Sequence, residues 1–219
     1  MKEQQKKYEL TDEFIEHWSG KKLYRIRALV TFGAVVAGQL GGFVESEKNL
    51  DQSLSGNAWV YGNARVSGNA WVYGNAEVSG NAWVYGNAEV SGNAWVYGNA
   101  WVSGNARVYG NARVYGNARV YGNARVYGNA WVYGNAQVRS YAVISERKMI
   151  FWATNIGTEL GTLTVFNGKD GLIVTRGCFT GTVDEFLAKS AEVHDDKTKN
   201  EYKLLIEVAK SRILGVKDE

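Results

Sequence analysis

Few residues in this chain could carry acid–base or nucleophilic chemistry, and the main group lies near the C-terminus. Cys178, His194, Asp195 and Asp196 supply a thiol, an imidazole and two carboxylates. Such groups form an activated nucleophile when a fold brings them together. We favour a structural interpretation, in which the thiol is a small apolar filler after a strand. The His-Asp-Asp segment is then a polar link that starts the last helix. We predict no catalytic residue, no metal site and no cofactor.

A larger set of candidate functional residues, aromatic rings and arginines, recurs at fixed spacing in the middle of the chain. From Ser55 to Val138 one unit, [Ser/Tyr]-Gly-Asn-Ala-x-Val, repeats without a break, so the 84-residue span holds 14 six-residue units. The variable position x is most often Trp or Arg. Both residue types are enriched at the energetic centres of interfaces, so the direction in which they point decides what they can do.

The six-residue period indicates a β-solenoid. Within Ala-x-Val, two small or apolar residues alternate with a variable one, which is the pattern of a strand with one buried face. Gly-Asn supplies a sharp corner, because glycine adopts positive φ without strain. A helix is excluded, since a Gly-Asn pair in every unit would break it. Short strands joined by such corners can wind around a triangular core.

The pattern resembles the hexapeptide repeat of left-handed parallel β-helices. In that family an aliphatic residue fills the core, here Val60, Val66 and onward, and a small residue such as Ala64 lies inside near the corner. The resemblance implies three units per coil and about 5 coils, stacked like neighbouring strands at about 4.8 Å. The asparagines would then form amide ladders at the corners.

Three units per coil place the variable residues in three outward columns. We expect rings and charges in these columns to contact each other between coils. The columns are Trp59, Glu77, Trp95, Arg113, Trp131; then Arg65, Trp83, Trp101, Arg119, Gln137; then Trp71, Glu89, Arg107, Arg125.

The aromatic and arginine columns form the candidate binding surface. One interpretation is structural, with rings that stack between coils and shield the backbone. The other is an interface with a second copy or a protein partner. A nucleic-acid track is disfavoured, because the arginines step around successive faces. The candidate residues are Trp59, Trp71, Trp83, Trp95, Trp101, Trp131, Tyr97, Tyr115, Arg107, Arg113, Arg119 and Arg125.

The segments that flank the repeat are expected to close its open ends. Residues 1–54 contain a predicted β-hairpin, with strands near residues 14–18 and 23–32. The segment Gly38-x-Leu-Gly-Gly-Phe-Val-Glu45 then leads into Gly56-Asn-Ala-Trp-Val-Tyr61. This combination resembles the entry segment of YdcK-type hexapeptide proteins and of small proteins of phages, prophages and gut bacteria.

Residues 145–219 are predicted to form an α+β module after the repeat domain of residues 55–144. Short strands are expected at residues 150–153, 161–166 and 171–176. The segment Thr182-Val-Asp-Glu185 is a capping box ahead of a helix, and residues 177–186 resemble part of a C-terminal module of the same phage-type proteins. A second helix is predicted to bury one face made of Tyr202, Leu205, Ile206, Ala209 and Ile213.

Hexapeptide β-helices include acyltransferases, which use a histidine as general base on a coil or a loop beside it. The only histidines, His17 and His194, lie outside the repeat, and no loop interrupts the units. An acyltransferase relative is therefore the least favoured alternative.

Composition excludes several further classes. A single cysteine cannot form a disulfide framework within the chain. No apolar run approaches about 18 residues, and the first residues lack an apolar signal core. A net charge of +3 is too small to indicate nucleic acid by itself. These observations favour a cytoplasmic protein with no membrane segment.

Together these patterns predict a mainly β, non-enzymatic scaffold. We expect a homo-oligomer, either a trimer or a dimer, that presents the C-terminal module to a protein partner. The phage-type resemblance implies a phage or prophage accessory protein. The alternative is an inhibitor that binds a host defence protein or nucleic acid.

Overall fold

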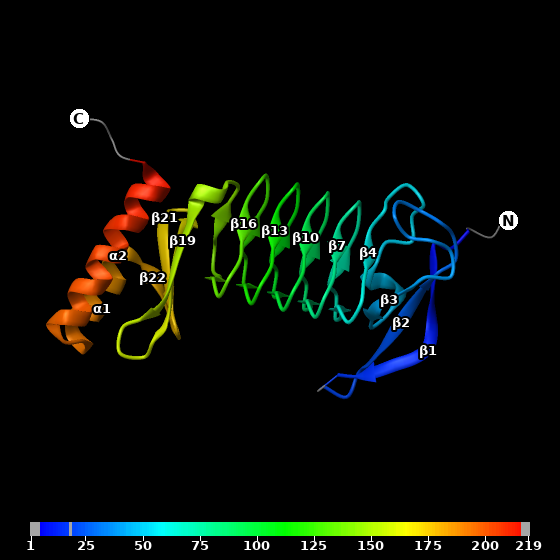
Figure 1. Ribbon diagram of the computed structural model, residues 1–219, viewed down its shortest axis with the longest axis horizontal. Coiled ribbons are helices and arrows are strands. Elements are labelled where there is room, and N and C mark those ends of the chain that lie inside the picture. The colour runs from blue at the N-terminus through cyan, green and yellow to red at the C-terminus, as the bar shows by residue number, and fades with distance from the viewer. Residues whose placement is uncertain (1–4, 18, 216–219) are drawn as a thin grey trace.

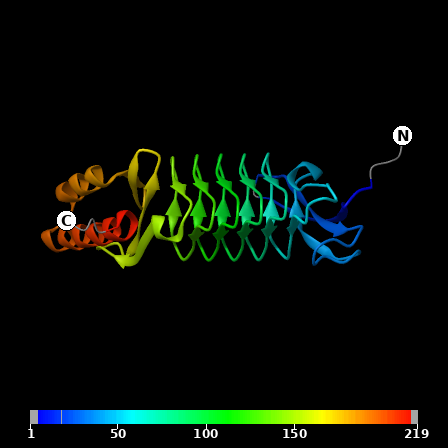
Figure 2. The same cartoon turned by 90° about the horizontal axis from the view of Figure 1, so that it is seen from above.

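The computed structural model describes residues 5–17 and 19–215. Figure 1 shows an elongated molecule in which a β-solenoid lies between an N-terminal β region and a C-terminal sheet with two helices. Seen from above, the coils stack along one axis (Figure 2). In the described part of the chain, no helix is long and apolar enough to cross a membrane.

Each repeat unit contributes a two-residue strand made of the variable residue and the valine, and strands three units apart pair in parallel. The three predicted columns are thereby confirmed. The β4 face holds β4 (Trp59–Val60), β7 (Glu77–Val78), β10 (Trp95–Val96), β13 (Arg113–Val114) and β16 (Trp131–Val132). The β5 face holds β5 (Arg65–Val66), β8 (Trp83–Val84), β11 (Trp101–Val102), β14 (Arg119–Val120) and β17 (Gln137–Val138). The β6 face holds β6 (Trp71–Val72), β9 (Glu89–Val90), β12 (Arg107–Val108), β15 (Arg125–Val126) and β18 (Val143–Ile144).

The solenoid is longer than the repeat motif. Strand β3 (Leu40–Val44) pairs in parallel with β5, and Leu50 forms an isolated bridge with Val72. At the other end β18 pairs with β15, although its Ala-Val-Ile sequence has lost the Gly-Asn corner. The structure therefore has about six turns rather than the predicted 5, as the six parallel strands on the β5 face show. The segments β3 and β18 extend the stack without the full repeat sequence, because parallel pairing requires only a strand.

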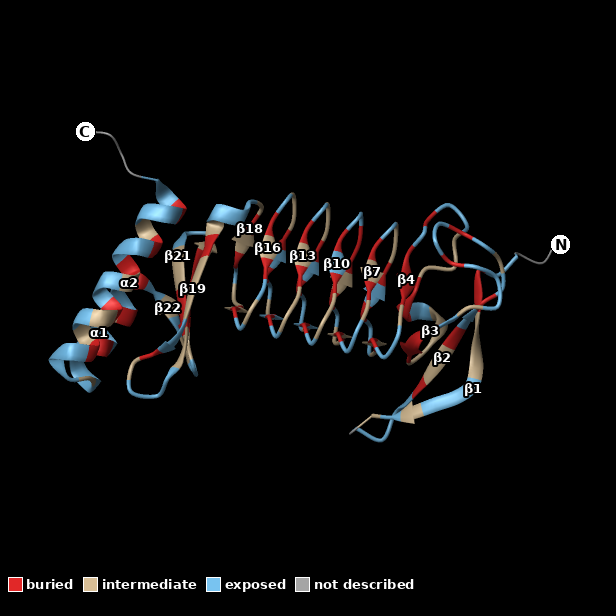
Figure 3. Ribbon diagram, in the orientation of Figure 1, coloured by how far each residue is buried: buried red, intermediate tan, exposed pale blue. Residues whose placement is uncertain are grey.

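The solenoid core consists of the repeated alanines and valines. All of them, from Ala58 to Val138, have 0 % exposed surface, and Figure 3 shows the buried residues recurring in every coil. Each buried valine contributes about 1.5–3 kcal/mol relative to an exposed one. A single narrow core of small side chains thus holds the coils together along the whole length.

Two constraints require glycine at the corners: a left-handed backbone conformation and close contact with the backbone of the next coil. Gly92 has a φ of +66°, in the left-handed region where an L side chain is strained. A Cβ added there would lie 2.8 Å from the backbone nitrogen of Gly110 in the next coil. Gly62 has a similar φ of +59°, but the nearest atom to its added Cβ would be 3.7 Å away.

The asparagines form the predicted amide ladders along the corners. In one ladder the Nδ2 of Asn75 donates to the Oδ1 of Asn93 at 3.2 Å, and Asn93 donates to Asn111 at 3.1 Å. The same bond recurs at the other two corners, for example from Asn69 to Asn87 and from Asn81 to Asn99. Each coil is therefore joined to the next by side chains as well as by backbone.

The N-terminal region continues the β5 face. Strands β1 (Tyr8–Glu16) and β2 (Lys22–Ala28) are antiparallel, which confirms the predicted hairpin. Strand β2 pairs with β3, so the hairpin extends the parallel sheet of the solenoid. Trp18, which the predicted first strand included, lies outside the described residues.

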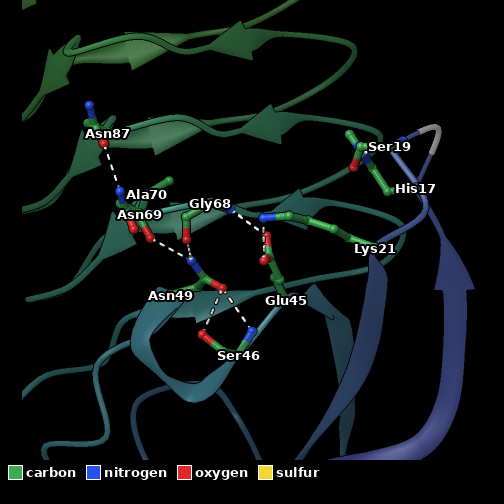
Figure 4. A network of polar contacts seen from close by, with 10 residues as sticks. All are labelled: His17, Ser19, Lys21, Glu45, Ser46, Asn49, Gly68, Asn69, Ala70 and Asn87. Atoms are coloured by element: carbon green, nitrogen blue, oxygen red, sulfur yellow. Dashed lines mark hydrogen bonds and ion pairs between the residues drawn. The ribbon is translucent and has the colours of Figure 1, made fainter.

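Polar side chains close the first coil. Asn49 is the last residue of the short 3-10 helix η1 (Glu47–Asn49). Its Nδ2 donates to the carbonyls of Gly68 and Ala70 at 3.0 and 2.9 Å (Figure 4). Glu45 accepts from the Gly68 N–H and from Lys21, both at 2.7 Å. Burial opposes ionisation of Glu45, but these bonds hold its pKa below the usual range.

The C-terminal module follows a second 3-10 helix, η2 (Arg147–Met149). Its three predicted strands and two helices are present, and it has a fourth strand, β22, which sequence analysis missed because its Phe-Thr-Gly-Thr sequence has no apolar alternation. The elements are β19 (Ile150–Ile156), β20 (Gly161–Gly168), β21 (Gly171–Arg176), β22 (Phe179–Thr182), α1 (Val183–Val193) and α2 (Asp196–Leu214).

The two faces of this sheet have different partners. Toward the solenoid, Phe166 joins the main core, Thr175 donates to the Gln137 carbonyl at 2.7 Å, and Thr164 accepts from the Gln137 N–H at 3.1 Å. On the opposite face Leu163 packs in a second core with the helices. The sheet thus supplies the hydrogen bonds that the last coil lacks.

The start of each helix is capped as predicted. Thr182 accepts from the Glu185 N–H at 3.2 Å, and Glu185 accepts from the Thr182 N–H at 2.7 Å, which completes the capping box. Asp195 caps α2 by accepting from the Thr198 N–H at 2.9 Å. Hydrogen bonding to the Thr198 side chain, and then to its backbone N–H, holds the pKa of Asp195 below its usual range. In α2 the side chains of Tyr202 and the other predicted face residues are buried or half-buried.

The two demands on the corner glycines can be separated by substitution. Gly62→Ala should lower the free energy of unfolding by about 1–2 kcal/mol, because it introduces only left-handed strain. Gly92→Ala should cost clearly more, because its methyl group also strikes the next coil. Urea unfolding of both variants measures the difference, and equal losses would show that stacking adds no separate constraint.

Candidate binding surface

The outward residues of the β4 face form an alternating stack of tryptophan and arginine. The Arg113 guanidinium lies 5.1 Å from the Trp95 ring centroid and 5.3 Å from that of Trp131. Arg147, from η2, lies 3.4 Å above the other side of Trp131. We call Trp95, Arg113, Trp131 and Arg147 the aromatic–arginine column. Cation–π attraction favours this order and holds each guanidinium in a fixed place.

A tyrosine column runs beside it. Tyr97, Tyr115 and Tyr133 stack with centroid separations of 4.8 and 5.0 Å and nearly parallel planes. Trp152 of β19 ends the column, with its ring edge-on to Tyr133 at 4.2 Å. Burial, helped by the neighbouring phenols Tyr97 and Tyr133, raises the pKa of Tyr115. The two columns touch at Tyr115 and Trp131, whose rings are 6.4 Å apart.

Both columns end at a cavity between the solenoid and the C-terminal module. This junction pocket has a volume of about 550 Å³ and receives residues from β16, η2, β19 and α2. It combines aromatic rings with three cationic side chains. Its lining residues are Trp131, Tyr133, Arg147, Lys148, Ile150, Phe151, Trp152 and Arg212.

The β5 face has an aromatic pair between two arginines. Trp83 and Trp101 stack at 5.5 Å, with Arg65 4.9 Å from the Trp83 ring and Arg119 5.0 Å from the Trp101 ring. The ring of His17 lies 5.4 Å from Trp83. The hairpin therefore brings a histidine onto a coil, a contact that the sequence separation of these residues did not indicate.

The β6 face is more polar. Trp71 stacks on Tyr73 at 4.0 Å, and Glu89 pairs with Arg107 at 3.1 Å. Arg125 follows Arg107 in register, so two like charges are neighbours there. The exposed arginines of this face belong to one column, while Arg113 and Arg119 belong to the other two.

The prediction that Trp59 points into solvent is wrong. Its side chain has 0 % exposure, because Tyr8 and Phe32 of the N-terminal region pack edge-on against its ring at 6.1 and 5.4 Å. Trp59 is the first variable residue of the repeat, so the segment that closes the solenoid covers it. It is a core residue and cannot contact a partner.

The candidate reactive residues near the C-terminus do not form a common site. Cys178 follows a strand, as expected, but it is exposed in the turn between β21 and β22 and so does not fill a packed space. His194 ends α1 and lies beside Tyr202 at 5.4 Å, in a small cavity whose lining does not include Cys178. Asp195 is occupied as a helix cap. Among the described residues, no His, Cys, Asp and Glu cluster could hold a metal ion.

The repeat matches a known family. The YdcK Beta solenoid repeat matches residues 58–74, 88–104, 100–116, 106–122, 112–126, 118–134 and 124–141. The repeat region of this chain is similar to the YdcK beta-solenoid repeat over these residues. The matched residues include Trp95, Arg113 and Trp131, whereas Arg147 and Arg212 lie outside the YdcK repeats. No curated protein matches the chain.

The part of the surface that lies beyond the repeat has no counterpart in the six-residue pattern. Counting 18 residues from Trp131 leads to Met149, yet the column is continued by Arg147. The 3-10 helix breaks the register, so no periodic signal could have identified it. Arg212 reaches the same pocket from a helix more than 60 residues along the chain.

The energetic role of the aromatic–arginine column can be measured at Arg113. Arg113→Gln should lower the free energy of unfolding by about 1–2 kcal/mol, because two cation–π contacts are lost. Arg125→Gln is the matched control on the β6 face and should be neutral or stabilising, because it removes a like-charge neighbour of Arg107. Equal destabilisation of the two variants by urea unfolding would contradict this role.

Replacement of two glutamates at equivalent repeat positions should change the melting temperature at pH 7 in opposite directions. Burial raises the pKa of Glu77, so the folded state favours its protonated form, and this contribution to stability is lost as pH rises through the usual carboxyl range toward the raised value. Glu77→Gln should therefore raise the melting temperature at pH 7 and change it little at pH 3.

Glu89→Gln is the matched control for this experiment. It should lower the melting temperature at pH 7, because it breaks the ion pair with Arg107. Thermal scans of both variants between pH 3 and pH 7 test the contrast. A Glu77→Gln variant that is less stable than the native chain at pH 7 would contradict the assignment.

Proposed function

We propose that this chain is a non-enzymatic scaffold that self-associates through its outward aromatic residues and presents the C-terminal module to a protein partner. The main support is the exposure of large rings on a rigid backbone. Trp71, Trp95 and Trp101 expose 42, 41 and 37 % of their surface on three different faces. Exposed tryptophans in such numbers are typical of contact surfaces, and their placement around the rod suits a dimer or a trimer.

The regularity of the coils supports a scaffold rather than an enzyme. Each unit from Ser55 to Val138 has the same length, so no loop leaves the coil to form a substrate groove. His17 approaches the β5 face, but its Nδ1 lies 2.6 Å from the Ser19 hydroxyl within the same turn. This hydrogen bond positions the imidazole of His17 within the turn of the β1–β2 hairpin, which supports a structural role for it.

The C-terminal module supports the second half of the proposal. Its sheet is attached to the last coil through Phe166 and the threonine bonds to Gln137, so the rod and the module are firmly joined. Helix α2 exposes Leu204 and Val208, at 58 and 46 % of their surface, on its outer side. We further propose that the chain is a phage or prophage accessory protein, a proposal supported by the resemblance of residues 177–186 to phage-type modules.

Self-association is tested by replacing the exposed rings. The double variant Trp95→Ser with Trp101→Ser should raise the dissociation constant of the assembly by about tenfold or more, because interface tryptophans often contribute 2 kcal/mol or more. Sedimentation velocity over a concentration series measures the change. Tyr141→Ser, which alters an exposed ring outside the three variable columns, is the control and should leave the assembly unchanged.

Two results would contradict self-association. One is a native chain that sediments as a monomer at micromolar concentration. The other is a double variant whose melting temperature falls while its assembly is unchanged, since the rings would then stabilise only the coil that carries them.

A further inference from the structure

The junction pocket is a preformed cavity on a rigid support. Its volume of about 550 Å³ lies within the range of small-molecule sites, which is about 300–1,000 Å³. Trp131 and Tyr133 come from the last coils, Phe151 and Trp152 from β19, and Arg212 from the last turn of α2. The threonine bonds to Gln137 join the sheet that carries Phe151 and Trp152 directly to the last coil.

Cationic groups in this pocket outnumber acidic ones. Arg147 is fixed over the Trp131 ring at 3.4 Å and forms no ion pair with the described residues. Lys148 has an ion pair with Glu146 at 3.5 Å, and both side chains are more than half exposed. Arg212 is exposed and also has no ion pair within the described part of the chain. Two guanidinium groups are thus available to an anion.

The aromatic lining restricts which anion would fit. Tyr133 and Trp152 form an edge-on pair at 4.2 Å on the solenoid side of β19, whereas the half-buried Phe151 lines the pocket from the side of the helices. Arg147 has one guanidinium face on Trp131, which leaves its N–H edge for a bidentate contact with phosphate. Aromatic rings beside such a donor recognise a planar ring, because bases stack on them without sequence preference.

We propose that the junction pocket binds a nucleotide, with the base against the ring of Trp152 and the phosphates on Arg147 and Arg212. The unit recognised could be a free nucleotide or one nucleotide of a single strand. The arginines of the repeat step around the solenoid, whereas these cations converge because η2 and α2 lie outside it. This inference goes beyond the proposed scaffold function and does not depend on self-association.

The test is calorimetric titration of the full chain, with tryptophan fluorescence as a second readout. Adenosine 5′-triphosphate should bind, while inorganic triphosphate and adenosine should each bind at least about tenfold more weakly, since each lacks one half of the recognised unit. Comparison with a short oligothymidylate identifies the source, because tighter binding per site assigns a single strand and weaker binding a free nucleotide.

Arg212→Gln should weaken binding by at least about tenfold, the effect expected for one charge-assisted hydrogen bond. Lys203→Gln makes the same charge change at an exposed position of α2 outside the pocket, and it should change affinity by less than about twofold. The proposal is wrong if nucleotide and oligonucleotide both fail to bind at millimolar concentration. It is also wrong if triphosphate binds as tightly as the nucleotide, or if the two variants weaken binding equally.

Discussion

The structure depends on a backbone register in which each coil stacks on the next. The N–H of Trp95 donates to the Ala112 carbonyl at 2.9 Å, and two residues later Tyr97 donates to Val114 at 3.0 Å. Asn99 then donates to Gly116 at 2.8 Å, so the corner is bonded as well as the strand. Nearly every N–H is needed by a neighbour, which accounts for the absence of proline from the chain.

This register places each residue type directly above its own kind, and the side chains must tolerate that arrangement. Glycine permits it because it has no Cβ, and asparagine because its amide both donates and accepts. Tyrosine permits it by stacking in parallel, as Tyr115 does between its two neighbours. Charged side chains do not tolerate stacking on like charges. The β4 face avoids it by alternating Arg113 with tryptophan, whereas Arg107 and Arg125 remain adjacent on the β6 face.

The stacked register also means that the two ends of the solenoid must be closed, because the first and last coils have backbone hydrogen-bonding groups with no neighbouring coil to pair with. At the first coil Asn49 donates to the buried carbonyl of Ala70 and the fully buried Lys7 donates to that of Ala58, and burial lowers the pKa of Lys7. At the last coil Thr164 and Thr175 perform the same task. The two closures also shape the surface, since one covers Trp59 and the other creates the junction pocket.

The sequence by itself determined the solenoid, its three columns and its amide ladders. A repeat of 14 identical spacings allows one parallel register, so local pattern and tertiary contact carry the same information. The α2 face and the capping box were equally readable, because they depend on residues three or four positions apart. Tertiary structure alone decided that Trp59 is buried, that Cys178 is exposed and that Arg147 and Arg212 meet at one pocket. These outcomes depend on how the non-repetitive segments at the two ends pack against the solenoid. Those contacts join residues far apart in the sequence, so no periodic spacing predicts them.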